Sequence, residues 1–350
     1  MAYTDIDDSS AFFQTTLYTG NGSTNAITGV GFQPDWVWLK NRGDSYNHAV
    51  FDSVRGVTKF LAVNNSNDEE TNAAELTAFG TDGFTLGDAD RPNKNTDAYV
   101  SWNWKAGTSF SNDVSATSVG SIDSVGSVST DAGFSIISWT GSGSAATIAH
   151  GLGSKLSVYI VKNRSDDGED WIVYHGANTS APQTDYIMLN ETNATGDSAG
   201  VWNDVAPTST VFSVGTAAST NGSSKNMIAY CFAEKQGYSK FGNYVGNGNA
   251  DGPFIYLGFK PAWLLVKLSS GTDDWQILDN KRSPNNIVGG YLRTNTNAAT
   301  INNDVIDFTS NGFKLRTSAG SWNPDGGTFI YLAFAENPLV TSKGVPATAR

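Results

Sequence analysis

Short runs of apolar residues recur along the chain, and each is bounded by glycine or proline before it and by polar residues after it. The clearest are DWVWLK (35–40), SVYIVK (157–162) and AWLLVK (262–267). Runs of four to eight β-branched and aromatic residues are typical of strands in the core of a β-sandwich. The segments AYVSWNW (98–104) and FIYLAFA (329–335) alternate instead, which is the period-two pattern of a half-buried strand.

Turn signals separate these runs. Asp82-Gly83 and Asn311-Gly312 are each followed by Phe-x-Leu, and both dipeptides predict hairpins because Gly and Asn accept a positive φ. The one helix that the pattern predicts is a short one within 66–78, with Ser66 as its cap and Glu69 at its third position. The sequence therefore predicts an all-β chain with little helix.

An aromatic residue followed by two spaced glycines occurs three times, as YTGNG (18–22), WTGSG (139–143) and YVGNG (244–248). We interpret each as the end of a strand, where the aromatic ring enters the core and the glycines allow a sharp turn or a bulge. The alternative, a phosphate-binding loop, is disfavoured because no helix begins after the motif and no basic residue lies near it.

Longer segments repeat as well. GFQPDWVWLKNR (31–42) matches GFKPAWLLVKLS (258–269) at an offset of 227 positions, and FGTDGFTL (79–86) matches FTSNGFKL (308–315) at 229. A middle copy is more diverged, with VYIVKNR at 158–164. Such conservation of spacing indicates duplication, so we expect three units, spanning about 11–107, 131–235 and 238–336.

These units predict three tandem β-sandwich repeats of the jelly-roll or lectin-like kind. The first occupies 1–107, the second 131–237, and the third 238–350 with a C-terminal tail. The intervening 108–130 is rich in Ser, Gly and Val, which predicts a linker that can include one extended stretch. The third unit follows the second almost directly, so we expect those two to pack closely.

One charged pair is duplicated. Asp52 and Arg55 recur as Asp279 and Arg282 at the same offset of 227. We expect a charge-assisted hydrogen bond that closes a turn after the Trp-bearing strand. The middle unit has His175 near this place and no such pair, which argues against a ligand site shared by all three units.

Several of these segments carry a family resemblance. The runs GFQPDWVWLKNR, FDSVRG, FGTDGFTLG and YVSWNWKAG, then FSIISWTGSG, HGLG, VKNR and YCFAE, and the closing AFAENPLVTSKGVPATAR resemble a repeat-built module of bacteriophage structural proteins. The module is met in tail-fibre and tail-associated proteins of phages that infect marine bacteria and cyanobacteria. The resemblance implies a virion component with β-sandwich domains, and it implies no catalytic residues.

Fibre proteins of this kind carry a virion-anchoring region before such modules. The first repeat here begins within about a dozen residues of Met1. This favours a short tip, an adaptor-bound receptor binder or a capsid decoration over a long fibre that anchors itself.

The amino-acid composition excludes some classes of binding partner. Charged residues make up 16% of the 350 residues and the formal net charge is −12. An acidic surface repels phosphate backbones and anionic lipids, so neither nucleic acid nor a membrane surface is expected as a partner. Cys231 is the single cysteine, which excludes a disulfide framework within the chain. The N-terminus, MAYTDIDDSSAFF, has no signal-peptide pattern, so we expect synthesis in a host cytoplasm.

The sequence holds no catalytic motif, and we expect no metal and no cofactor. His48, His150 and His175 have no metal-ligand spacing. Two acidic clusters precede Trp residues at similar places in their units, namely 166–170 and 273–274. We interpret both as solvated hairpin tips, and the alternatives are paired carboxylates of a glycosidase or oxygen ligands for Ca²⁺.

Tryptophans offer one further candidate. Trp36, Trp104 and Trp263 occupy core-like positions. Four others lie in loop-like contexts beside Asp, Asn, Gly or Pro, and we name them as candidate carbohydrate-binding residues because an indole face can stack on a sugar: Trp171, Trp202, Trp275 and Trp322. The alternative is that they anchor loops or line interfaces.

Together these features predict a non-enzymatic virion protein of the tail-fibre or receptor-binding type. It would bind a host surface glycan, other virion proteins or both, and would form a homo-oligomer, with a trimer favoured. Two alternatives stay open. One is a capsid decoration or tail-adaptor protein, and the other is a polysaccharide depolymerase that uses Asp167 or Asp274.

Overall fold

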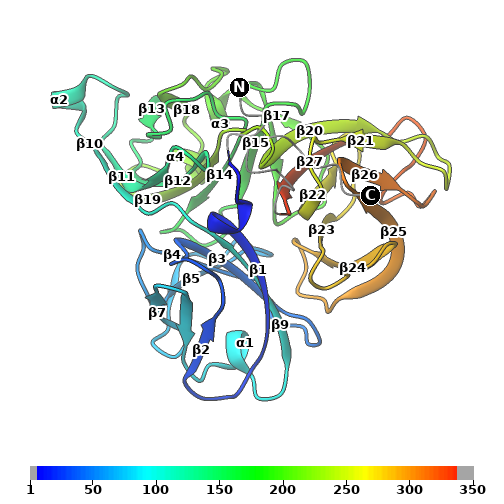
Figure 1. Cartoon of the computed structure of the whole chain (residues 1–350). Coiled ribbons are helices and arrows are strands. Elements are labelled where there is room, and N and C mark those ends of the chain that lie inside the picture. Colours follow the sequence, from blue (N-terminus) through cyan, green and yellow to red (C-terminus); the bar gives the residue numbers. More distant parts are fainter. Residues whose placement is uncertain (1–5, 337–350) are drawn as a thin grey trace.

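The computed structural model describes residues 6–336, and Figure 1 shows them as three lobes around a common centre. Lobe 1 (13–104) is blue to cyan, lobe 2 (108–232) is mostly green, and lobe 3 (239–335) is yellow to red. The fold is all-β, as predicted. The helical segments described are single turns: η1 (Ser9–Ala11), α1 (Asp90–Asn93), α2 (Val114–Thr117), α3 (Ala199–Trp202) and α4 (Ala218–Asn221).

Each lobe contains one large antiparallel sheet. In spatial order, the sheet of lobe 1 comprises β1 (Phe13–Thr19), β9 (Ala98–Trp104), β3 (Trp36–Asn41), β4 (Ala49–Asp52), β5 (Lys59–Ala62) and β6 (Glu70–Thr71). The sheet of lobe 2 comprises, again in spatial order, β10 (Thr108–Asn112), β11 (Ser124–Ser129), β12 (Phe134–Thr140), β19 (Asn226–Phe232), β14 (Val158–Asn163), β15 (Ile172–His175), β16 (Asp185–Met188) and β17 (Gly196–Asp197).

The sheet of lobe 3 comprises, in the same sense, β20 (Ser239–Val245), β27 (Thr328–Ala335), β22 (Pro261–Leu268), β23 (Trp275–Asp279), β24 (Val288–Arg293), β25 (Ile301–Thr309), β26 (Gly312–Leu315) and β21 (Phe254–Tyr256). The first five strands of lobe 3 follow the order that β1, β9, β3, β4 and β5 follow in lobe 1 and that β12, β19, β14, β15 and β16 follow in lobe 2.

A smaller layer covers the outer face of each large sheet. In lobe 1 it is a sheet of β2 (Asn25–Thr28), β8 (Gly83–Leu86) and β7 (Leu76–Gly80), and in lobe 2 a pair of β13 (Ala146–Ala149) and β18 (Val211–Val214). In lobe 3 the strands β25, β26 and β21 form the covering layer as a continuation of the large sheet. Each lobe is therefore a β-sandwich with a core of its own.

The central strands read as continuous apolar runs because both of their faces are buried. In β3, Val37 and Leu39 enter the core of lobe 1, whereas Trp36 and Trp38 point into a core shared by all three lobes. The strands β14 and β22 divide their residues between two cores in the same way. The alternation expected of a strand is present, but both sets of alternate residues are hydrophobic.

Aromatic rings fill the shared core. Trp36 of lobe 1 lies 4.5 Å, between ring centroids, from both Trp104 of its own lobe and Tyr230 of lobe 2. Trp104 meets Trp263 of lobe 3 edge-on at 5.6 Å, and Phe334 of lobe 3 lies 5.8 Å from Phe232 of lobe 2. The prediction that Trp36, Trp104 and Trp263 are buried is confirmed, since each is at most 2% exposed.

The spaced glycines make the sharp turns that we predicted. The second glycine has a positive φ in each copy, and at the first a Cβ atom would lie within about 2 Å of a carbonyl oxygen, as at Gly20 against Lys94. Each turn wraps around one fully buried asparagine. In lobe 3, for example, the Asn323 amide donates to Asn247 Oδ1, Asn249 O and Thr317 O, and Asn93 and Asn221 make equivalent bonds in the other lobes.

Two predictions about connecting segments were wrong. The predicted linker at 108–130 contains β10 and β11, which extend the sheet of lobe 2 at its edge. The predicted helix within 66–78 is absent: the segment contains the short strand β6 and the start of β7. Its Glu69 forms ion pairs with Arg55 and Arg164, which explains why local helix propensity does not decide its conformation. The hairpins at Asp82-Gly83 and Asn311-Gly312 are confirmed. The predicted C-terminal tail lies mostly outside the described residues.

Candidate functional site

The duplicated charged pairs form as ion pairs and also join neighbouring lobes. Arg55 Nε donates to Asp52 Oδ2, and Arg282 Nε donates to Asp279 Oδ2 over 2.6 Å, with both side chains of each pair fully buried. The same Asp52 oxygen accepts a hydrogen bond from the Tyr230 hydroxyl of lobe 2 at 2.7 Å.

Asp279 of lobe 3 accepts in the same way from the Trp102 indole of lobe 1 at 3.1 Å. In lobe 2 the equivalent residue is His175, whose Nε2 donates to the Tyr331 carbonyl of lobe 3 at 3.1 Å. Lobe 1 thus contacts lobe 2, lobe 2 contacts lobe 3, and lobe 3 contacts lobe 1. The three lobes form a closed ring, and residues at equivalent positions of the lobes join its members.

The tryptophans named as carbohydrate platforms are buried, so that prediction was wrong. Trp171, Trp202, Trp275 and Trp322 are each at most 1% exposed, which leaves no indole face for a sugar. Trp171 Nε1 donates to Ala62 O of lobe 1 at 2.9 Å, and Trp275 donates to a carbonyl of lobe 2 at 2.8 Å. Their polar sequence neighbours belong to the loops that surround these contacts between lobes.

The acidic clusters have structural partners that explain part of their charge. Asp170 accepts from the Asn190 amide and Asp274 from the Asn295 amide, both at 2.7 Å. Asn190 and Asn295 in turn accept from the backbone N–H of the buried tryptophan that follows each cluster. Asp166 pairs with Lys225 at 2.5 Å, and Asp167 is exposed. These positions agree with the interpretation as hairpin tips.

All three histidines are buried and hydrogen-bonded at both ring nitrogens. His48 Nδ1 accepts from Trp38 at 3.0 Å and its Nε2 donates to Arg293 O at 3.0 Å. His150 and His175 show the same arrangement of an accepted N–H and a carbonyl partner. Burial lowers the pKa of each ring, to about 4 for His150 and His175. Neutral, fully bonded rings offer no lone pair to a metal or a substrate.

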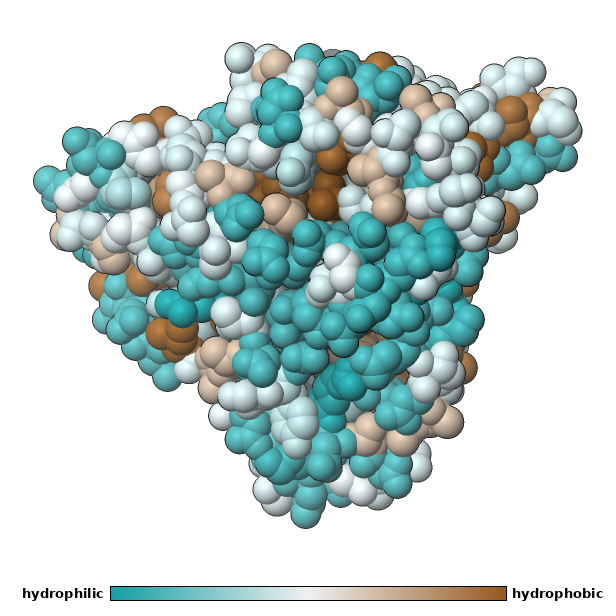
Figure 2. Space-filling model, turned by 180° about the vertical axis from the view of Figure 1, so that it is seen from behind, coloured by the Kyte–Doolittle hydropathy of each residue, from teal (hydrophilic) through white to brown (hydrophobic). Residues whose placement is uncertain are grey.

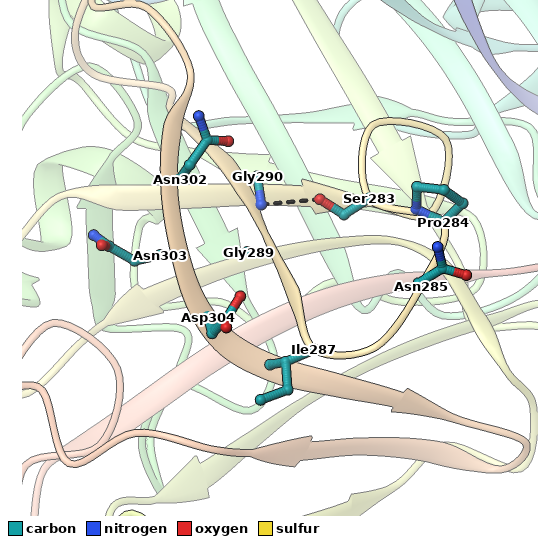
Figure 3. A pocket seen from close by; sticks show the side chains of 9 residues that line it. All are labelled: Ser283, Pro284, Asn285, Ile287, Gly289, Gly290, Asn302, Asn303 and Asp304. Atoms are coloured by element: carbon teal, nitrogen blue, oxygen red, sulfur yellow. Dashed lines mark hydrogen bonds between the residues drawn. The ribbon is translucent and has the colours of Figure 1, made fainter.

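A depression of about 520 Å³ lies on lobe 3, between the loop and strand at 283–290 and residues 302–304 of β25. Its floor is backbone at Gly289 and Gly290, and its rim carries the exposed side chains of Asn285, Asn302 and Asp304. Figure 3 shows the Ser283 hydroxyl accepting from the Gly290 N–H at one end, at 2.9 Å.

A β-bulge shapes this depression. Val288 pairs with Ile306 and Gly290 pairs with Asn302, so Gly289 alone faces three residues of β25. A Cβ on Gly289 would lie 2.7 Å from Asn303 O and 3.0 Å from Asp304 Oδ1. Bulges and interior glycines of this kind mark places where a strand re-aims its side chains or where a ligand approaches the backbone.

The loop that borders the depression is longer in lobe 3 than in lobe 1. The β24 residue Arg293 follows Arg282 by 11 positions, whereas the equivalent Ala62 of lobe 1 follows Arg55 by 7. The four additional residues belong to the loop that forms one wall. Sequence reasoning missed this site, although the change of offset from 227 to 229 between copies already indicated unequal loops.

Within residues 6–336 no group of three or more His, Cys, Asp or Glu is arranged to hold a metal ion. No helix in the same range is long and apolar enough to cross a membrane. Hydrophilic side chains dominate the middle of the face seen in Figure 2.

Comparison with known proteins gives a family without an assigned activity. The model described as "Domain of unknown function (DUF7483)" matches residues 8–338. No curated protein matches the chain. Since the match covers almost the whole sequence, this chain belongs to the DUF7483 family.

Proposed function

We propose that this chain is a non-enzymatic structural protein of a bacteriophage particle, of the tail-fibre or receptor-binding type, and that the depression on lobe 3 binds a host surface glycan. The assignment to a virion rests on the sequence resemblance described above. The observation that carries the binding role is that the polar residues repeated among the lobes bond internally, while the depression on lobe 3 is open and is bordered by a loop four residues longer than its equivalent in lobe 1.

The composition of the depression suits a neutral, hydroxyl-rich ligand. Asn285 and Asn302 supply amide donors and acceptors, and Asp304 supplies a carboxylate acceptor for sugar hydroxyls. Pro284 and Ile287 offer aliphatic surface for the C–H face of a ring. The net charge of −12 disfavours strongly anionic ligands.

Binding is favoured over hydrolysis by the number of carboxylates. Glycosidases of the common kind use two carboxyl groups on either side of the scissile bond. The residues that line the depression include one, Asp304. The acids of the two sequence clusters lie elsewhere, on lobe 2 and at the start of β23.

The expected homotrimer stays part of the proposal, and the ring of lobes limits which surfaces can join the chains. The contacts that would join three such lobes are already made within one chain. An interface between chains would therefore use other surfaces than these junctions.

The proposal is tested by binding of the full chain to immobilised neutral glycans and to host cells. The double variant N302A/D304A should lose binding at least tenfold, and D167N, an exposed acid on lobe 2, should bind as the parent does. Binding that survives the double variant would refute the site. Release of sugar from host polysaccharide that D167N or D274N abolishes would refute the non-enzymatic assignment. A virion density map that places the chain on the icosahedral shell would refute the tail location.

A further inference from the structure

The three junctions of the ring are built from equivalent positions but carry different charges. At each junction a backbone N–H of one lobe donates to the carbonyl of the residue that follows β14, β22 or β3 of the next lobe. The pairs are Glu69 to Arg164, Thr195 to Ser269, and Thr300 to Arg42, at 2.9–3.0 Å. Because these three backbone bonds join equivalent positions, the side chains at the three junctions can be compared position by position.

Where lobe 1 meets lobe 2, two arginines face two carboxylates, and the partly exposed Lys59 lies 3.9 Å from the Glu69 carboxylate. The Glu69 carboxylate accepts from Arg164 Nε at 2.9 Å and from Arg55 Nη1 at 3.3 Å, both on Oε2. Arg55 also holds Asp52 through its Nε and Val50 O through its Nη2. Burial alone would raise the pKa of Glu69, but the two guanidinium groups outweigh it and hold the pKa below its usual value.

Where lobe 2 meets lobe 3, the same positions are neutral. Thr195 replaces the glutamate, and its hydroxyl donates at 3.0 Å to Asn178, which stands at the position of Arg55. Ser269 stands at the position of Arg164, and a neutral His175 at the position of Asp52. The side chains at these positions therefore find hydrogen-bond partners, and none of them is charged.

Where lobe 3 meets lobe 1, two cations face a single anion. Arg282 holds Asp279 and Ile277 O with its Nε and Nη2, as Arg55 does with its own partners. Arg42 stands at the position of Arg164, but Thr300 stands at the position of Glu69. The two buried atoms equivalent to those that bind Glu69, Arg282 Nη1 and Arg42 Nε, have no hydrogen-bond partner within the described residues, and neither has the Thr300 hydroxyl.

We propose that a small monovalent anion, either chloride or a free carboxylate such as acetate, binds at the junction of lobes 3 and 1 on Arg282 Nη1, Arg42 Nε and the Thr300 hydroxyl. The Glu69 carboxylate at the first junction is its internal equivalent. Threonine is shorter than glutamate by the carboxyl group, so the replacement removes the group whose place the anion takes.

Charge supports an anion over water. Arg42 is partly buried and Arg282 shares its single carboxylate partner Asp279, so one positive charge here has no counter-charge. A water molecule supplies an acceptor but no charge. Burial lowers the pKa of Arg42, the neighbouring Arg282 lowers it further, and Asp279 opposes both. An anion at this place would restore the match of two arginines and two anionic groups found at the first junction.

The unmodified chain tests this directly. Crystals soaked in bromide should show an anomalous peak within hydrogen-bond distance of Arg42 Nε and Arg282 Nη1. In solution, chloride and acetate should each raise the melting temperature when compared at constant ionic strength with a bulky anion that cannot enter. At ten times the dissociation constant, the unfolding equilibrium shifts by about elevenfold. The anion with the larger shift is the preferred ligand, whereas no bromide peak and equal melting temperatures would overturn the proposal.

Two variants give a matched pair. T300E supplies the carboxylate from the chain, and it should raise the melting temperature and abolish the response to chloride or acetate. E69T makes the first junction like the third, and it should be less stable and gain a second anion-dependent step. A T300E variant that keeps the full anion response would contradict the assignment of the site, even if bromide binds elsewhere.

Discussion

The hydrogen bond between Tyr230 and Asp52 gives the sharpest test of ring closure between lobes 1 and 2. The substitution Tyr230→Phe removes one hydroxyl and keeps the ring that stacks on Trp36 at 4.5 Å. The lost bond is 2.7 Å long and joins two side chains that are fully buried. A hydrogen bond to a charged group contributes about 1.5–3 kcal/mol. Asp52 keeps Arg55 and two backbone N–H donors, so we expect a loss of about 2 kcal/mol.

A matched control lies within lobe 2. The Tyr159 hydroxyl is equally buried and has no hydrogen-bond partner among the described residues, so Tyr159→Phe should change stability by less than about 0.5 kcal/mol or increase it. Both variants are compared with the parent by urea unfolding, followed by tryptophan fluorescence and circular dichroism. The reasoning is refuted if Tyr230→Phe costs no more than Tyr159→Phe.

Other buried groups give three further predictions. Trp36→Ala should destabilise the chain by about 3–5 kcal/mol in urea unfolding, because the ring packs on both Trp104 and Tyr230; a cost below about 1 kcal/mol would contradict a shared core. Asn323→Ala should cost about 3 kcal/mol in the same assay, since it removes three hydrogen bonds of a fully buried amide at about 1 kcal/mol each, and an unchanged midpoint would count against the role of this side chain in the turn. Because the folded pKa of His150 and His175 is lowered to about 4, the unfolded chain binds more protons between pH 6.5 and 4, so stability present above pH 6.5 should fall by about 3 kcal/mol per histidine as the pH drops to 4. Burial raises the pKa of Glu75 to about 7, so this one group has the opposite effect on stability. The variant His175→Gln should show a smaller loss of unfolding free energy between pH 6.5 and 4 than the parent, and equal losses would contradict the prediction.

The strands and their hairpins could be predicted because their signals are local. The apolar run at Trp36–Asn41 and the turn at Asp82-Gly83 each specify their structure within a few residues. The Ser- and Gly-rich segment at 108–130 lacks such a signal, since its strands lie at the sheet edge and bury few large side chains. Glu69 shows the opposite case, in which a helix-favouring residue is used for contacts between lobes.

The ring could not be predicted because its bonds use different residues at equivalent positions. Tyr230 and Trp102 donate to a carboxylate, but the equivalent Leu332 cannot, and His175 reaches a backbone carbonyl instead. The exposure of the four candidate tryptophans could not be predicted for a related reason. A polar neighbour in the sequence indicates a loop, but it does not reveal that another lobe covers that loop.

The three β-sandwiches share one aromatic core, and we expect them to fold as one unit. Scanning calorimetry of the full chain tests this most directly through the ratio of calorimetric to van't Hoff enthalpy. The shared core and the closed ring predict one transition with a ratio near one. Separate transitions, or a ratio near three, would show that the lobes unfold independently and would contradict a common core.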